Sequence, residues 1–142
     1  MVWGAISAAG KSQLIRLHGN INADQYQEQA LANGLIPFLN NHNGNMHFMH
    51  DGAKPHTART TTAWLAAHRV QVFGPWPSKS PDMNPIENCW SNIIEYLPGV
   101  AARTRDDLEI ALRSAIEQVT LTHIRNWFTH CCYCTSPSPK VL

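Results

Sequence analysis

The sequence of residues 46–73, MHFMHDGAKPHTARTTTAWLAAHRVQVF, alternates between patterns typical of a strand, a helix and a strand. Met46–His50 is a short apolar run that stops at Asp51, where the following glycine is typical of a turn. Thr57–His68 carries apolar residues at helical spacing, and Val70–Phe73 is a second short apolar run. A strand, a helix and a strand in this order predict an α/β layered domain.

The residues before this segment predict a β-hairpin. Val2–Ser7 has the apolar pattern of a buried strand, and Gly10-Lys11 is a typical turn pair. Ser12–Leu17 then alternates apolar and polar residues, as expected for a second strand that is paired with the first.

Helical patterns account for most of the remaining chain. The expected helices run from Asn22 or Ala23 to Leu39, from Pro85 to Leu97, from a Thr104–Asp107 cap to about Val119, and from Leu121 to Thr129. Gly34 and Pro37 weaken the last turns of the first of these helices. Residues 74–85 are rich in Pro and Ser and predict a loop, and residues 136–142 predict a flexible tail. The expected order is β-β-α-β-α-β-α-α-α.

The composition excludes several classes of protein. The 142 residues suit one domain, and the 44% share of apolar residues excludes a disordered chain. The net charge of +1 is far below that of a strongly basic DNA-binding domain. No run of about eighteen apolar residues predicts a membrane span, and no basic-then-apolar leader predicts secretion. The cysteines, three of them crowded near the end, fit a reducing intracellular compartment better than a disulfide framework.

Two carboxylates lie at positions where catalytic or ligand-binding residues are often found, although each also has a structural explanation. Asp51 follows an apolar strand, and ligands of open α/β sheets bind at the carboxyl ends of strands. The pair Asp51-Gly52 is, however, also a common turn. Glu87 lies in the first turn of a predicted helix, where Asn84 and Pro85 would equally explain it as part of a capping box.

The surroundings of these two acids resemble a known family. HDGAKPHTA (His50–Ala58) and WPSKSPDMNPIENCW (Trp76–Trp90) resemble the two signature blocks of the mariner superfamily of DDE transposases, including its bacterial insertion-sequence relatives. VWGAIS (Val2–Ser7) looks like the strand that follows the first catalytic strand of this family. WFTHCCY (Trp127–Tyr133) looks like the aromatic-rich end of the insertion-sequence relatives, so the resemblance covers nearly the whole chain.

The resemblance implies a ribonuclease H-like three-layer fold with a site of three acids. By motif match, Asp51 is the second Asp and Glu87 is the Glu, both as ligands of Mg²⁺ or Mn²⁺. His56 matches a family histidine that would position the nucleophile or contact DNA, although it could equally cap the following helix. The implied activity is metal-dependent DNA strand cleavage and strand transfer on transposon ends and target DNA. The implied location is the nucleus of a eukaryote or otherwise the cytoplasm, and a homodimer would suit the joining of two ends.

The first acid of that site has no counterpart in this sequence. It would precede Val2–Ser7 on a central strand, and Asp24 lies in the wrong element to replace it. We therefore expect residues 1–135 to be an N-terminally truncated catalytic domain that is inactive in this form. The missing strand would leave the edges of Val2–Ser7 and Met46–His50 unpaired, unless these strands close on each other.

Two alternatives remain open. A decayed or domesticated transposon remnant would share the fold and bind DNA or protein without catalysis. A zinc-binding module could use a cluster of Cys and His side chains near the end of the chain, although two adjacent cysteines are poor spacing for zinc. The residues of that cluster are His123, His130, Cys131, Cys132 and Cys134.

Overall fold

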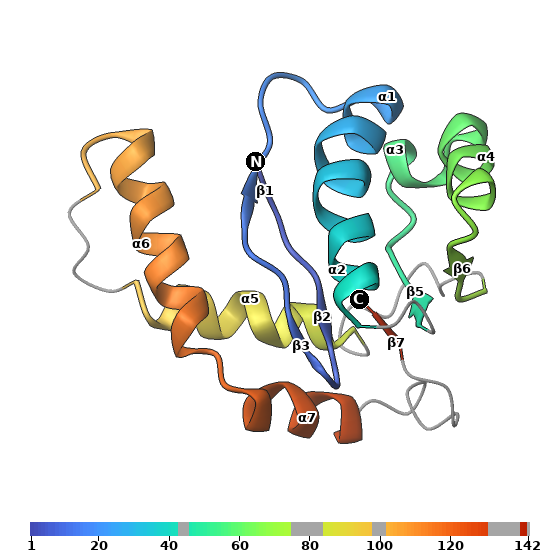
Figure 1. Ribbon diagram of the computed structural model, residues 1–142. Helices are drawn as coiled ribbons and strands as arrows, with labels where there is room; N and C mark the ends of the chain where they lie inside the picture. The colour runs from blue at the N-terminus through green and yellow to red at the C-terminus, as the bar shows by residue number, and fades with distance from the viewer. Residues whose placement is uncertain (43–45, 75–83, 98–101, 131–139, 142) are drawn as a thin grey trace.

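The computed structural model describes residues 1–42, 46–74, 84–97, 102–130 and 140–141. These residues form a mixed α/β structure with short strands in the middle and helices around them (Figure 1). The predicted order of strands and helices is confirmed in outline, but each arm of the hairpin is divided in two and a further strand follows the last helix. Among the described residues, no helix is both long and apolar enough to cross a membrane.

The hairpin consists of four short strands. They are β1 (Val2–Trp3), β2 (Ile6–Ser7), β3 (Gly10–Lys11) and β4 (Ile15–Arg16). The prediction of a turn at Gly10-Lys11 is wrong, because these residues pair with β2 and the turn lies at residues 8–9. A distant contact favours this arrangement: the Lys11 ammonium donates to the carbonyls of Ile116 and Val119 at 2.6 and 2.8 Å.

A β-bulge separates the two halves of the hairpin. The pairs β1–β4 and β2–β3 differ in register by one residue, so residues 4–5 face residues 12–14. Ser12 occupies the bulge: its N–H donates to the Ala5 carbonyl at 2.8 Å, and its hydroxyl oxygen accepts from the Ala5 N–H at 2.8 Å. The bulge explains why β1 and β4 form a separate two-stranded sheet.

The helix after the hairpin continues through three segments. They are α1 (Ala23–Gln25), the π-helical η1 (Tyr26–Leu35) and α2 (Ile36–Asn41). Asn22 begins the helix, since its side chain accepts a hydrogen bond from the Gln25 N–H at 2.9 Å. Gly34 does not interrupt the helix; it lets the hairpin approach closely, because a Cβ at this position would lie 2.8 Å from Ile15 Cδ1 and against the ring of Trp3.

The central segment forms two parallel strands with two helices between them. The elements are β5 (His47–Phe48), α3 (Lys54–Thr57), α4 (Arg59–Ala67) and β6 (Gln71–Val72). The prediction of one helix over Thr57–His68 is wrong at its start, because the chain is already helical at Lys54 and breaks at Ala58, where φ is −58° and ψ is 140°. The Thr61 hydroxyl donates to the Pro55 carbonyl at 2.7 Å and ties α4 to α3 across this break.

Three helices follow β6, as predicted. They are α5 (Pro85–Glu95), α6 (Arg105–Gln118) and α7 (Leu121–His130). Asn84 caps α5, and Thr104 and Asp107 form the expected capping box at the start of α6. These starts are predictable because a cap is formed by residues that are close in sequence.

A last strand, β7 (Lys140–Val141), differs from the flexible tail predicted for residues 136–142. It lies between the hairpin and β5, so the larger sheet has the order β3-β2-β7-β5-β6 (Figure 1). The strand is antiparallel to β2 and parallel to β5. The expectation of unpaired edges is therefore corrected at Ser7 of β2 and at β5, which both pair with β7. Among the described residues, β1 pairs with β4 alone, so the expectation holds for its other edge. A pattern of Pro and Ser residues does not predict β7.

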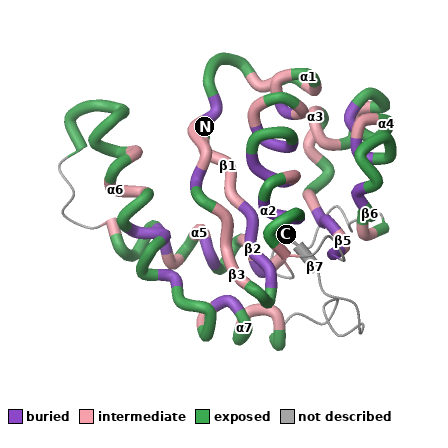
Figure 2. The backbone as a smooth tube through the Cα atoms, in the orientation of Figure 1, coloured by how far each residue is buried: buried purple, intermediate pink, exposed green. Residues whose placement is uncertain are grey.

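The hydrophobic core lies on both faces of the strands. Consecutive residues alternate between two clusters, as the pleat of a strand requires: Ala5 and Phe48 belong to one cluster, and Ile6 and Met49 to the other. The first cluster is completed by η1, α2 and α4, and the second by α5, α6 and α7. Figure 2 shows the buried positions along the strands and on the helix sides turned toward them. Helices therefore cover both faces of the sheet.

Candidate active site

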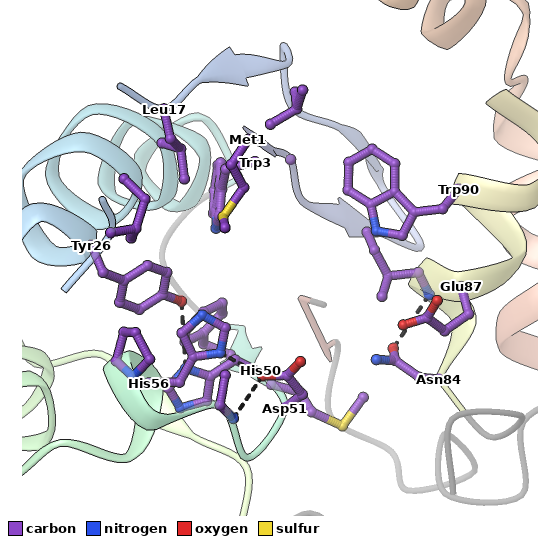
Figure 3. Close-up of a pocket in the computed structure, with 18 residues that line it drawn as sticks. Met1, Trp3, Leu17, Tyr26, His50, Asp51, His56, Asn84, Glu87 and Trp90 are labelled. Atoms are coloured by element: carbon purple, nitrogen blue, oxygen red, sulfur yellow. Dashed lines mark hydrogen bonds and ion pairs between the residues drawn. The ribbon is translucent and has the colours of Figure 1, made fainter. Parts of the chain in front are cut away.

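A cavity of about 410 Å³ lies between the hairpin, the end of β5 and the start of α5. Its apolar walls include Trp3 and Trp90, and its polar groups include Asp51, His56 and Glu87. Figure 3 shows Asp51 and Glu87 on opposite sides of this space. All three site residues predicted from the sequence therefore lie on one cavity.

Asp51 is held by its own loop through one of its two carboxylate oxygens. Oδ1 accepts from the Ala53 N–H at 3.0 Å and lies 2.6 Å from His56 Nδ1. Oδ2 forms no hydrogen bond with any of the described residues. The Asp51 side chain is 61% exposed, so this second oxygen is available to a ligand in the cavity.

His56 is part of a group of aromatic rings behind Asp51 that also includes Tyr26 and His50. Its ring centroid lies 4.2 Å from that of Tyr26 and 5.2 Å from that of His50. The Tyr26 hydroxyl oxygen lies 3.5 Å from His50 Nδ1. These contacts restrict the His56 ring, so the imidazole that contacts Asp51 has a defined orientation.

Burial changes the protonation of the two rings next to His56. Burial lowers the pKa of His50 to about 4, and the neighbouring His56 adds to this effect while Asp51 opposes it. Burial also raises the pKa of the Tyr26 hydroxyl, so that it stays protonated at neutral pH. At neutral pH the wall behind Asp51 is therefore uncharged at both His50 and Tyr26.

Glu87 approaches the cavity from the first turn of α5. Asn84 caps this helix by accepting a hydrogen bond from the Ile86 N–H at 3.3 Å, and Pro85 is buried below it. The structural explanation of Glu87 as half of a capping box is not borne out: its exposed side chain forms no hydrogen bond or ion pair with the part of the chain that the structure describes. No described residue therefore holds this carboxylate, which lines the cavity.

Sequence reasoning missed Tyr26 and His50 as part of this site. His50 precedes Asp51 directly, so its place beside the site could have been inferred from the neighbouring acid. Tyr26 lies in η1, where it is 2% exposed, and it has the spacing of an ordinary core residue. No local pattern distinguishes it, because its contact with His50 joins residues that are 24 positions apart.

The proposed zinc ligands fall largely outside the described residues. Cys131, Cys132 and Cys134 cannot be placed, whereas His123 and His130 lie on α7. Within the described ranges, no group of three or more His, Cys, Asp or Glu side chains could hold a metal. Cys89 is buried in the core, and this burial raises the pKa of its thiol to about 11, which disfavours the thiolate that metals bind.

The fold is that of a mixed α/β domain, and two carboxylates face each other across its cavity. The comparisons with known proteins agree with this class of domain. Residues 1–109 match the DDE superfamily endonuclease family, and the chain belongs to this family. The predicted resemblance to transposases of the mariner type is confirmed by relatives from two Caenorhabditis species.

These relatives are transposases of transposable elements. The chain is 31% identical over 126 residues to the transposable element Tcb1 transposase of Caenorhabditis briggsae, a match that covers 88% of this chain and 45% of the relative. It is 29% identical over 125 residues to the transposable element Tc1 transposase of Caenorhabditis elegans, with 87% of this chain and 45% of the relative covered. The chain thus spans less than half the length of these curated relatives.

Proposed function

We propose that the chain is part of the catalytic domain of a DNA transposase with a ribonuclease H-like fold, and that Asp51 and Glu87 are two of its metal ligands. One observation carries this proposal: the two carboxylates lie on the same cavity although two helices and a strand, α3, α4 and β6, separate them in sequence. The helices on both faces of the sheet and the membership of the DDE endonuclease family support it.

The residues of the cavity fit a hard divalent cation. The family generally uses a divalent metal, and Mg²⁺ and Mn²⁺ prefer carboxylate and carbonyl oxygens to thiols or imidazoles. Asp51 Oδ2 and the two Glu87 oxygens are the carboxylate oxygens of the cavity that accept no hydrogen bond from a described residue. A bound Mg²⁺ would neutralise charge on a scissile phosphate and favour ionisation of the attacking oxygen.

The protein residues themselves would prepare the site. His56 holds Asp51 through Oδ1, so Oδ2, which has no described partner, could bind a cation. The cap at Asn84 fixes the first turn of α5, from which Glu87 extends. DNA is the proposed partner, and the exposed side chains of Lys54 and Arg59, close in sequence to Asp51, would attract its phosphates.

Metal binding tests the assignment of the two acids. Replacing Asp51 by asparagine or Glu87 by glutamine keeps the shape of each side chain and removes one charged ligand. We expect each change to weaken Mn²⁺ binding about tenfold, equivalent to about 1.4 kcal/mol, when bound Mn²⁺ is measured by electron paramagnetic resonance. The matched control is Asp24→Asn, which removes an exposed acid of α1 outside the cavity and should bind Mn²⁺ as the wild type does. Equal Mn²⁺ affinity in all four proteins contradicts the assignment.

The chain by itself is proposed not to cleave DNA. Asp51 and Glu87 are the acids among the described residues that line the cavity, and two carboxylates hold a pair of metal ions poorly. We expect supercoiled plasmid to stay intact in the presence of the chain and Mg²⁺ or Mn²⁺, with agarose gels as the readout. Nicking by the wild type that disappears in Asp51→Asn would overturn this proposal, and it would at the same time support Asp51 as a catalytic ligand.

A further inference from the structure

The contact between Asp51 and His56 is partly open to solvent. The two side chains are 61% and 23% exposed, and Asp51 Oδ1 lies 2.6 Å from His56 Nδ1. A pair at such exposed positions is weak by itself, because water competes for both groups and two side chains must be ordered to form it. The position of the Asp51 carboxylate therefore depends on what holds the His56 ring in place.

Tyr26 is a buried residue that packs directly on the His56 ring. It is 2% exposed, its ring centroid lies 4.2 Å from that of His56, and the two ring planes are inclined by 34°. Figure 3 shows Tyr26 and His56 next to each other on the side of the cavity that carries Asp51. The imidazole of His56 thus contacts the core through Tyr26 and the cavity through Asp51.

Tyr26 is itself held relative to α3 by hydrogen bonds. It begins η1, and its N–H donates to the Asn22 carbonyl at 2.9 Å in the turn that Asn22 caps. The side chain of the next residue, Gln27, donates to the Thr61 hydroxyl oxygen at 3.3 Å, and this hydroxyl donates to the Pro55 carbonyl at 2.7 Å. These bonds connect η1 to α3, the helix that carries the imidazole, and restrict movement of one relative to the other.

We propose that Tyr26 is a positioning residue of the metal site: its ring holds the imidazole of His56 against Oδ1 of Asp51 and thereby fixes the carboxylate. The inference rests on the proposed function, in which Asp51 binds the cation. The aromatic ring carries this effect rather than the hydroxyl, because the hydroxyl interacts with Trp3 and His50 and not with His56.

The tautomer of His56 in the metal-free chain tests the positioning by itself. A carboxylate only accepts hydrogen bonds, so an imidazole in contact with Asp51 should carry its proton on Nδ1. Long-range ¹H–¹⁵N correlation spectra at about pH 8, where an ordinary imidazole is neutral, show which ring nitrogen is protonated. We expect the Nδ1–H form of His56 in the wild type and in Tyr26→Phe. Tyr26→Leu removes the planar ring and should shift His56 toward the Nε2–H form that histidine favours in water.

Phe38→Leu is the matched control for the loss of a buried ring. Phe38 is 5% exposed and belongs to the same core cluster as Tyr26. It also packs on a histidine, with 4.7 Å between its ring centroid and that of His42, but it does not line the cavity. Phe38→Leu should therefore leave the tautomer of His56 unchanged.

Mn²⁺ binding connects the positioning to the cation. We expect Tyr26→Leu to bind Mn²⁺ about threefold more weakly than the wild type, a smaller effect than the roughly tenfold to hundredfold loss typical when a direct partner of a metal ligand is removed. Tyr26→Phe and Phe38→Leu should keep the wild-type affinity. If Asp51→Asn also keeps it, the proposed metal site fails, whereas the tautomer of His56 still tests the role of Tyr26.

Three results would overturn the proposal. They are a persistent Nδ1–H form of His56 in Tyr26→Leu, an equal loss of this form in Phe38→Leu, and unchanged Mn²⁺ affinity of Tyr26→Leu when Asp51→Asn weakens binding. If Tyr26→Leu loses its helical circular dichroism, the wild-type chain decides. The ring protons of Tyr26 and His56 should then show a nuclear Overhauser effect, and its absence excludes the contact.

Discussion

Replacing Phe48 by alanine is expected to lower the free energy of unfolding by about 3–5 kcal/mol, a large part of the total stability of a domain. Phe48 is 1% exposed and belongs to the core cluster that joins the hairpin, η1 and α4. It lies in β5, between β7 and β6, and these neighbouring strands prevent the backbone from moving into the space that the missing ring would leave. The lost stability therefore includes both the free energy of transferring the ring from water into the core and the cost of the space left unfilled.

Urea unfolding followed by tryptophan fluorescence measures this loss. The matched control is Ile110→Ala on α6, whose side chain is 66% exposed and which should change stability by no more than about 0.5 kcal/mol. The Phe48 ring also lies 4.9 Å from the His50 ring, centroid to centroid. The variant should accordingly raise the pKa of His50, because burial is the main cause of its lowering. A loss below about 1 kcal/mol would contradict the place of Phe48 in the core.

Acid is expected to destabilise the chain through His50 by about 3 kcal/mol between pH 7 and pH 4. Burial lowers the pKa of His50 from 6.5 to about 4 in the folded chain. At pH 7 His50 is neutral in both states, so it contributes no difference. As the pH falls below 6.5 the unfolded chain binds a proton that the folded chain does not bind, and stability decreases until the pH reaches the folded pKa near 4.

The free energy of unfolding measured in urea at several pH values tests this dependence. Other groups titrate in the same range, so the informative quantity is the difference between the wild type and His50→Gln. We expect this difference to change by about 3 kcal/mol between pH 7 and pH 4, in favour of the variant at low pH. His18→Gln, at an exposed histidine, is the matched control and should follow the wild-type profile. Parallel profiles for the wild type and His50→Gln would show that His50 is not buried as the structure has it.

The starts of helices could be predicted from the sequence because they depend on neighbouring residues. Asn84 with Pro85 and Thr104 with Asp107 begin α5 and α6 where their patterns predict. A helix cap is a hydrogen bond between groups two or three residues apart, so its signal is local. The position of Asp51 could also be predicted locally, because it directly follows an apolar run that is typical of a strand.

The detailed strand boundaries could not be predicted, because they depend on partners that are distant in sequence. Residues 10–11 are typical of a turn, yet they form β3, where Lys11 reaches the carbonyl end of α6. The helix expected from Thr57 begins earlier, at Lys54 of α3, and breaks at Ala58; within α3, His56 contacts Asp51. A pattern of residue propensities does not show the contact of Lys11 with α6 or that of His56 with Asp51.

The sequence by itself determined that Asp51 and Glu87 were the acids to consider, through their positions in two ordered motifs. Only the tertiary structure placed both on one cavity, set the rings of Tyr26 and His50 beside His56, and left Asp51 Oδ2 without a described partner. It also placed Lys140–Val141 between β2 and β5, although Pro and Ser residues around this segment predict a tail. The physical reason is that caps and turns join near neighbours, whereas sheet pairing and burial join backbone segments whose meeting no local pattern records.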